Sequence, residues 1–291
     1  MGAFRDKLER GEFVVTSEVA PPRGTDYTKM RATVATLAPV SDAVNITDNQ
    51  GATLHLSSLA ASRITLEDGV EPIFQQTCRD RNRLALQSDL LAAWSLGLEN
   101  VLIVSGDNPH SGDHPQAKGV FDLDSTQLLQ VVTQMNNGTD MNGNPLDGDP
   151  TNFYIGAAAF PEAEPWEFQL ARIEEKVAAG AVFFQTQAIM DMDLFAKRLE
   201  DLKQFGVKLI PGILLLKSLR VINFINTRLP GLTVPPHLEA RIAAAEDPME
   251  EAIQIAIEQA KVCREIADGV HIMPLGSNQA AVRILKESGI R

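Results

Sequence analysis

One carboxylate at the end of a strand-like run is the first residue of this chain that has the setting for chemistry. Residues 15 to 24 read Val-Thr-Ser-Glu-Val-Ala-Pro-Pro-Arg-Gly, so a β-branched run delivers Glu18 to a point where Pro21 and Pro22 prevent any further strand. A lone acid held at a rigid strand end is a candidate proton donor. The alternative is structural, because Glu18 can instead cap the helix that follows Pro22 or pair with Arg23.

Two further polar residues follow apolar runs in the same way. Asp107 comes after Gly106 in IVSGDNP, where an aspartate that begins a turn is an equally good interpretation. Gln187 stands at the end of an apolar run, and a buried amide needs hydrogen-bond partners. A ligand with paired donors and acceptors would supply them.

Two other groups fit a structural role better than a chemical one. Cys78 has no evident neighbouring base, so we expect it to be a small buried hydrophobe rather than a nucleophile. The run from His110 to Asp113 and His114 has metal-binding residue types, but it lies on a loop with Gly and Pro rather than on a rigid element. We therefore expect a solvated loop there and no metal site.

These residues need a scaffold, and the chain alternates short β-rich runs with helical patterns. The runs are mostly continuous and apolar, as in strands buried on both faces, and they are Phe13–Val19, Asp42–Thr47, Pro72–Thr77, Asn100–Ser105, Phe153–Ala159, Ala181–Thr186, Val207–Ile213 and Gly269–Met273. Helical spacing of apolar residues occurs between them, for example in Asp26–Leu37, Arg81–Leu96, Ser125–Met135, Pro165–Ala179, Met192–Phe205 and Met249–Ala267.

Eight such units in 291 residues predict a (β/α)₈ TIM barrel, with residues 1–291 forming a single domain. An open doubly wound sheet is the rival fold, but the chain has no GxGxxG turn and no GxxxxGK[ST] loop. In a barrel the chemistry belongs to residues at and just beyond the carboxyl ends of the strands. The turn-rich segment Asn136–Asn152 precedes a strand, so we expect it on the opposite face.

Composition limits the classes of partner. A formal net charge of −12 and a pI near 4.9 argue against binding to nucleic acid or to an anionic membrane surface. No apolar stretch approaches a membrane span, and the N-terminus reads as an amphipathic helix without a signal-peptide core. Two cysteines, Cys78 and Cys263, form no disulfide framework, so we expect a cytoplasmic protein.

The order of several strings resembles one family. SEVAPPRG, NITDNQGA, QTCRDRNRLALQSDLL, the SGD of IVSGDNPHSGDHPQAKGVFDLDS, IGAAAFPEAEP, FFQTQ, LIPGILLLKS and DGVHIM are similar to 5,10-methylenetetrahydrofolate reductase in its short bacterial form. The resemblance runs from about Phe13 to Gly289. It implies a flavin-dependent barrel that reduces methylenetetrahydrofolate to 5-methyltetrahydrofolate at the expense of a reduced nicotinamide, in a ping-pong sequence.

The resemblance also implies roles for individual residues. Glu18 matches the general acid that promotes opening of the imidazolidine ring, Asp107 the aspartate near the pterin and the flavin, and Gln187 the glutamine that hydrogen-bonds the pterin. Leu219 matches a substrate-binding position that is phenylalanine in some members. The flavin-contacting positions, in which Asp107 is included, are matched by Thr47, Gln75, Gly106, Ala158, Phe160 and Lys176.

Some positions depart from the family pattern. Gln75 stands where many members have histidine beside the flavin, and Ser105 replaces a common arginine. Glu164 and Gln169 replace a histidine and an aspartate. The cofactor that the resemblance implies is still FAD, with FMN possible, and the implied cosubstrate is NADH or NADPH.

Two other readings of the resemblance stay open. The chain can be a pterin-binding barrel subunit that needs an electron-donating partner, or a reductase that transfers hydride from nicotinamide without flavin. We also expect a homo-oligomer. The segment from Pro230 to Glu246 reads as an insertion before the last strand, and it can form either a wall of the substrate site or an interface.

Overall fold

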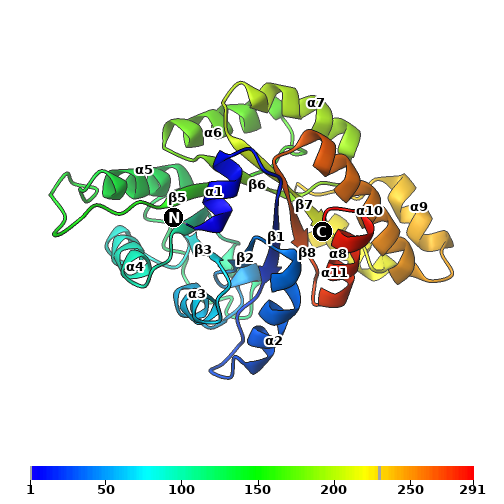
Figure 1. The fold of residues 1–291 in the computed structure, drawn as a ribbon, viewed down its shortest axis with the longest axis horizontal. Helices are drawn as coiled ribbons and strands as arrows, with labels where there is room; N and C mark the ends of the chain where they lie inside the picture. The colour runs from blue at the N-terminus through cyan, green and yellow to red at the C-terminus, as the bar shows by residue number, and fades with distance from the viewer. Residues whose placement is uncertain (1, 229–230) are drawn as a thin grey trace.

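The strands form a closed parallel barrel surrounded by helices (Figure 1). The computed structural model describes residues 2–228 and 231–291. The strands pair in chain order, and β1 closes the barrel against β8. Their bounds are β1 Val14–Val19, β2 Ala43–Ile46, β3 Pro72–Thr77, β4 Asn100–Val104, β5 Tyr154–Ala159, β6 Phe183–Ala188, β7 Lys208–Leu214 and β8 Gly269–Met273. The predicted (β/α)₈ barrel is confirmed, and each strand overlaps a predicted run.

Helices lie before, between and after the strands, and most of them form the outer layer. They are α1 Ala3–Glu9, α2 Thr28–Leu37, α3 Ser58–Glu67, α4 Arg83–Ser95, α5 Ser125–Asn136, α6 Trp166–Ala178, α7 Met192–Lys203, α8 Leu219–Arg228, α9 Pro236–Ala244, α10 Pro248–Ile266 and α11 Asn278–Glu287. Short 3₁₀ turns are η1 Ala38–Val40, η2 Gln50–Ala52 and η3 Pro109–Ser111. Within the described ranges, no helix has the length and apolar character that crossing a membrane requires.

Local signals in the sequence explain where several helices begin and end. The Asn82 side chain caps α4 by accepting hydrogen bonds from two backbone amides of its first turn. Asp124 and Gln127 form a reciprocal capping box at the start of α5. Gly97 and Gly180 follow α4 and α6 with φ of +82° and +106°, a conformation that glycine adopts without steric cost.

The first helix closes the barrel at the end where the strands begin. Phe4 and Leu8 of α1 are fully buried among residues at the starts of several strands. The Phe4 ring lies 5.5 Å from that of Phe183, and the Tyr154 ring stacks on Phe183 at 5.2 Å, centroid to centroid. Figure 1 shows α1 in dark blue among the strand labels near the centre of the molecule. A ligand must therefore enter from the opposite end, where barrel sites normally lie.

The turn-rich segment 136–152 lies on the closed side, as predicted. It joins the end of α5 to the start of β5, and Arg5 of α1 donates a hydrogen bond to the Asn152 side chain at 3.2 Å. The Met141 amide donates to the Gln87 side chain of α4 at 2.9 Å. This segment is thus attached to the scaffold and away from the open end.

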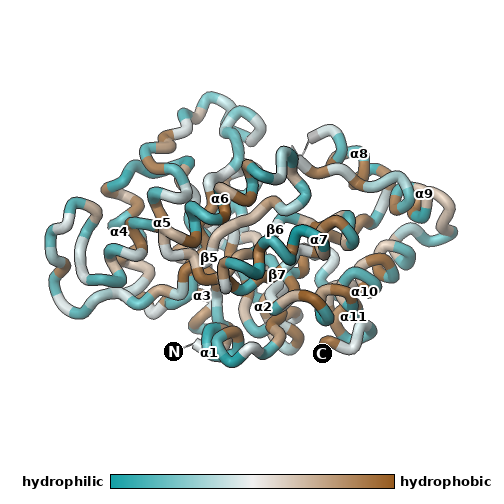
Figure 2. The backbone as a smooth tube through the Cα atoms, turned by 90° about the horizontal axis from the view of Figure 1, so that it is seen from above, coloured by the Kyte–Doolittle hydropathy of each residue, from teal (hydrophilic) through white to brown (hydrophobic). Residues whose placement is uncertain are grey.

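Among the described residues, three helices lie between β7 and β8. Of these, α10 packs against both strands and completes the helical layer, while α9 lies beside it at the outer edge of the molecule (Figure 1). Figure 2 shows hydrophobic positions recurring along α10 between hydrophilic ones, in agreement with its buried Ile253, Ala256, Ile257 and Ala260. The predicted insertion contains α9, and Pro230 lies outside the described residues.

Candidate active site

A cavity of about 820 Å³ opens at the end of the barrel where the strands finish. This volume is in the range of roughly 300–1,000 Å³ that small-molecule sites usually have. All of the predicted site residues except Leu219 line it, namely Glu18, Thr47, Gln75, Gly106, Asp107, Ala158, Phe160, Lys176 and Gln187. The fold thus gathers residues from distant parts of the chain into one site.

Glu18 reaches this cavity from β1 as a partly buried side chain. The Gln50 amide donates a hydrogen bond to it, with 2.9 Å between Nε2 and Oε1. The pKa of Glu18 is raised above its ordinary value, because burial and the nearby Asp107 charge outweigh the opposing effect of that hydrogen bond. A carboxyl that keeps its proton closer to neutral pH is suited to general-acid chemistry.

The structural alternatives for Glu18 are not realised. Tyr27, not Glu18, precedes α2 at its N-terminus. Arg23 pairs with Asp113 of the loop after β4 instead. Glu18 is therefore left facing the cavity, with Gln50 as its one side-chain partner among the described residues.

Asp107 lies at the rim of the same cavity, one residue after Gly106. Its Oδ2 accepts a hydrogen bond from the Gly51 amide at 2.8 Å. Gly106 has φ of +91°, and a Cβ at this position would lie 2.9 Å from the Arg79 Cβ. Only glycine fits this turn, which delivers Asp107 to the side of the cavity that holds Glu18.

A buried arginine ties three loops of the site together. Arg79, only 2% exposed, follows β3 and donates two hydrogen bonds of 2.7 Å to Asp80. The same guanidinium reaches the backbone carbonyls of Asn49, at 3.2 Å, and Asp107, at 3.4 Å. The loops after β2, β3 and β4 are thereby fixed to one another.

A second ion pair strengthens the same region. Asp48 has a fully buried side chain and accepts two hydrogen bonds from Arg81, at 2.7 and 3.2 Å. It also accepts hydrogen bonds from the backbone amide and the hydroxyl of Thr77, at 3.0 and 2.9 Å. The TCRDRNR string therefore supports the loops around Glu18 and Asp107. Its residue types alone did not predict this role.

One end of the cavity carries positive charge. Lys176 of α6 is 6% exposed and donates to the Ala158 carbonyl at 2.7 Å. Burial, with help from the neighbouring Arg172 charge, lowers the pKa of Lys176 to about 8. Arg172 also lines the cavity, one helical turn before Lys176. Lys176 bonds to a backbone carbonyl and Arg172 lies over the Phe168 ring, so within the described chain neither cation has a carboxylate in hydrogen-bond contact, which favours an anionic ligand group at this end.

The Thr47 hydroxyl gives an independent indication of a ligand. It is buried, lines the cavity and has no hydrogen-bond partner among the residues that the structure describes. Buried hydroxyls normally have a partner. Thr47, Arg172 and Lys176 therefore fit the phosphate and hydroxyl groups of a nucleotide-type cofactor.

The floor of the cavity is a network of neutral polar side chains. His271 of β8 makes a hydrogen bond of 2.9 Å to the Thr16 hydroxyl, and Gln185 of β6 donates to the same oxygen at 3.1 Å. Asn45 and Gln185 exchange hydrogen bonds across the barrel. Burial lowers the pKa of His271 to about 4, so the imidazole is neutral at physiological pH.

Apolar side chains form the opposite wall of the cavity, and the predicted Leu219 is not among them. Leu219 begins α8 and is 46% exposed, whereas Val221, Phe224 and Ile225 line the cavity. These three share a helix face through their three- and four-residue spacing, and Leu219 lies off that face. Gly231 and Leu232 of the insertion line the cavity too, so the start of the insertion contributes to this wall.

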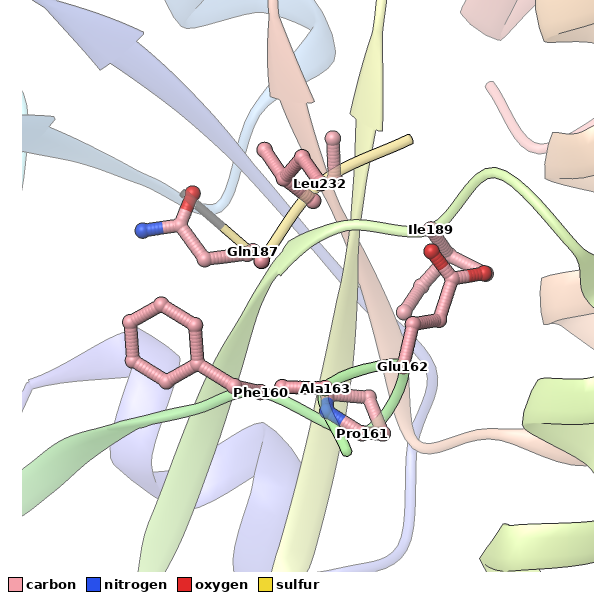
Figure 3. A pocket seen from close by; sticks show the side chains of 9 residues that line it. Phe160, Pro161, Glu162, Ala163, Gln187, Ile189 and Leu232 are labelled. Atoms are coloured by element: carbon pink, nitrogen blue, oxygen red, sulfur yellow. The ribbon is translucent and has the colours of Figure 1, made fainter. Parts of the chain in front are cut away.

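Gln187 lies within β6, not after it as predicted, at a register irregularity between β6 and β7. Figure 3 shows how the Gln187 side chain lies beside a recess that adjoins the main cavity. The Gln187 amide and the Phe160 ring project to one side of this recess, while Glu162 lies on the other side. Glu162 binds the Met190 and Asp191 amides at the start of α7. The Gln187 amide makes no side-chain hydrogen bond within the described ranges and is available to a ligand.

Cys78 is in the core, whereas His114 lies on an exposed loop. Cys78 is fully buried, and burial raises the pKa of its thiol to about 12, so it is a core side chain and not a nucleophile. His114 bonds to Asp113, which also pairs with Arg23. In the part of the chain that the structure describes, no three His, Cys, Asp or Glu side chains form a metal-binding group.

The cavity residues that sequence reasoning missed include Gln50, Arg172, Phe224 and His271. Arg172 had a signal, since it lies four residues before Lys176 in a helical pattern. His271 occupies a strand position whose inward direction follows from the register with Thr16. Gln50 and Phe224 belong to a loop and a helix whose placement depends on tertiary packing.

Comparisons with known proteins show what the whole chain is similar to. The family model described as methylenetetrahydrofolate reductase matches residues 3–289. A rice protein (Oryza sativa subsp. japonica) named probable methylenetetrahydrofolate reductase (NADH) is 30% identical over 82% of this chain and 41% of its own length. The 5,10-methylenetetrahydrofolate reductase of Pectobacterium carotovorum subsp. carotovorum is 24% identical over 97% of this chain and 92% of its own length. The chain spans about two fifths of the length of the plant relatives that it matches.

Solved structures support the fold alone. An uncharacterized protein from Clostridium thermocellum, which binds two copies of 5-methyl-5,6,7,8-tetrahydrofolic acid, superposes with a TM-score of 0.68 over 99% of each chain at 16% identity. A 2,3-dimethylmalate lyase covers 98% of this chain and 84% of its own, with a TM-score of 0.53 and 13% identity. The near-complete match to the family model decides the assignment: the chain belongs to the methylenetetrahydrofolate reductase family.

Proposed function

We propose that this chain reduces 5,10-methylenetetrahydrofolate to 5-methyltetrahydrofolate, with a reduced nicotinamide as the electron donor and a flavin as the bound cofactor. The observation that carries the proposal is the joint placement of Glu18, Asp107 and Gln187 in one cavity of a chain of this family. The names of the rice and Pectobacterium relatives support the activity. The folate bound by the Clostridium thermocellum protein supports the substrate class.

The residues divide the chemistry among them. The unpartnered Gln187 amide offers a donor and an acceptor to the edge of a pterin. Glu18, with its raised pKa, gives a proton to the bridging nitrogen as the imidazolidine ring opens. The Asp107 carboxylate stabilises the positive charge of the resulting iminium ion. The apolar wall that includes Phe224 would pack against the apolar part of the bound substrate.

A flavin fits the cationic end of the cavity. Thr47 would donate or accept a hydrogen bond through its unpartnered hydroxyl, and Lys176 with Arg172 would hold a phosphate group. When bound, a flavin supplies a hydride carrier between nicotinamide and folate. We propose FAD, with its reactive ring near Asp107.

The direct test has two measurements. Ligand released by heat from the purified protein is identified by chromatography, and 5-methyltetrahydrofolate is measured after anaerobic incubation with methylenetetrahydrofolate and either NADH or NADPH. We expect FAD and a folate product formed by the protein alone. Product formation with neither bound flavin nor a spectral change on adding FAD would instead establish flavin-free hydride transfer. Folate binding without turnover would establish a subunit that needs an electron donor.

A further inference from the structure

One short segment contacts both acids of the proposed site. Gln50 and Gly51 are adjacent residues of η2, in the loop after β2. The Gln50 side chain donates to Glu18 at 2.9 Å, and the Gly51 amide donates to Asp107 at 2.8 Å. Glu18 belongs to β1 and Asp107 follows β4, so residues 49–52, here called the clip, join two otherwise separate parts of the barrel rim.

The backbone of the clip is strained. Asn49, Gly51 and Ala52 have φ of 47°, 65° and 53°, a region that alanine rarely adopts. Such conformations persist only where the surrounding structure imposes them, and they concentrate at functional sites. The clip is therefore held by its neighbours and is not a relaxed turn.

The neighbours that hold the clip are themselves buried or tightly packed. Arg79 donates to the Asn49 carbonyl at 3.2 Å, and the Asn49 side chain accepts from the His55 amide at 2.9 Å. A Cβ added to Gly112 would lie 1.9 Å from the Ala52 carbonyl oxygen, so the loop after β4 approaches the clip as closely as a glycine allows. These contacts fix the backbone on both sides of Gln50 and therefore the point from which its side chain extends.

We propose that Gln50 is a positioning residue that holds the Glu18 carboxyl in both of its protonation states, an inference that rests on the proposed function. A carboxylate needs a hydrogen-bond donor, whereas a carboxylic acid also needs an acceptor. An amide supplies both, because its NH₂ group donates to the ionised form and, after rotation, its carbonyl accepts from the protonated form. Glu18 thus keeps its place while it loses and regains a proton.

The groups around Glu18 favour its protonated form, and the hydrogen bond from Gln50 acts against them. Asp107, from the loop after β4, favours the protonated form, as does burial. His271 on β8 is the ionisable side chain of the cavity floor, and it is neutral. The hydrogen bond from Gln50 is the interaction that lowers the pKa of Glu18. Removal of this hydrogen bond therefore moves the pKa of Glu18 upward.

The test compares Gln50→Met, which keeps the length but has no donor, with Leu54→Ala, which truncates an exposed side chain of the same loop. Folate-dependent reoxidation is followed from pH 5 to 9, and the Glu18 carboxyl is titrated by carbon-13 NMR, assigned with Glu18→Gln. For Gln50→Met we expect a rate loss of roughly 10–100-fold from lost orientation. Its alkaline limb and its Glu18 titration should both move to higher pH, while Leu54→Ala matches the parent.

A second variant guards against misfolding of the first. Gln50→Glu keeps the side-chain shape and places a second carboxyl beside Glu18, so the Glu18 titration should again move to higher pH. A Glu18 titration unchanged in both variants would overturn the proposal. The NMR readout separates the two inferences: a parent protein without reductase activity contradicts the proposed function, while the effect of Gln50 on Glu18 is still decided.

Discussion

The carboxylates of Glu18 and Asp107 share one cavity but have different surroundings. Glu18 is partly buried with an amide partner and a raised pKa, whereas Asp107 is exposed at the rim and accepts a backbone hydrogen bond. Two acids placed in different environments typically divide into a proton donor and a fixed charge. This difference supports the roles that we propose for them.

The role of Asp107 predicts a selective defect. Asp107→Asn keeps the shape and removes the charge, so flavin should be retained and folate reduction should slow more than nicotinamide oxidation. The reason is that the iminium ion forms only in the second half-reaction. Stopped-flow measurement of both half-reactions checks this. Equal slowing of the two would instead mean that Asp107 acts on the flavin alone.

The proposed contact between Lys176 and the cofactor predicts that cofactor binding depends on pH. Because its pKa is lowered to about 8, the ammonium charge is present below that pH and is lost above it. The dissociation constant for FAD should therefore rise between pH 7 and 9, and Lys176→Met should bind FAD more weakly at pH 7 with a flatter pH dependence. Fluorescence titration of the flavin measures both. A parent protein whose FAD affinity is constant over this range would show that Lys176 does not contact the phosphates.

Residue types alone were sufficient to select several of the site residues. Glu18 precedes two prolines and Asp107 follows a glycine, so the chain itself indicates that each sits at an abrupt turn. The partners of these acids could not be predicted from the sequence, because Gln50 and Gly51 meet Glu18 and Asp107 only through tertiary contacts. A single sequence without an alignment carries no signal for such pairs.

At the scale of elements, ion pairs and hydrogen bonds join the loops after β2, β3 and β4 into one unit. Asp48→Asn should destabilise the protein by roughly 2–4 kcal/mol, because it leaves the Arg81 charge and the Thr77 hydrogen bonds poorly matched. Urea unfolding gives the change in the free energy of unfolding. Asp122→Asn is the matched control: its pair with Arg83 is solvent-exposed, so its loss of stability should be smaller than that of Asp48→Asn. A loss for Asp48→Asn no larger than the control would contradict this account.

Strand and helix positions were largely predictable, but the faces of irregular elements were not. Continuous apolar runs located all of the strands. The register shift in β6 moved Gln187 into the strand, and α8 turned Phe224 rather than Leu219 toward the cavity. Both outcomes depend on how neighbouring elements pack, which local periodicity does not record.

At the scale of the whole molecule, α1 stabilises the fold at the end of the barrel that lies away from the cavity. The Phe4 ring is fully buried against Phe183 and Tyr154, at the closed end of the barrel. Phe4→Ala should lower the free energy of unfolding by about 3–5 kcal/mol, while kcat of the remaining folded protein stays near the parent value. Urea unfolding and steady-state assays measure the two quantities, with Leu84→Ala, at an exposed position, as the control. A large fall in kcat without loss of stability would disprove this role of α1.

The barrel as a whole followed from counting, since alternating strand and helix patterns of this number fit few folds. The sequence did not predict that Phe4, Tyr154 and Phe183 close the end of the barrel where the strands begin, because these residues come from distant parts of the chain. The N-terminal segment was predicted as an amphipathic helix, yet nothing in its spacing indicates which surface it covers.

The most direct test of the account is the effect of Glu18→Gln on the two half-reactions, measured anaerobically by stopped flow. The amide keeps the size of the side chain but has no acidic proton. We predict that flavin content and reduction by nicotinamide stay near the parent values, while reoxidation by methylenetetrahydrofolate falls by roughly two to four orders of magnitude. Reoxidation within a factor of about three of the parent would contradict the account, because a general acid contributes far more than that.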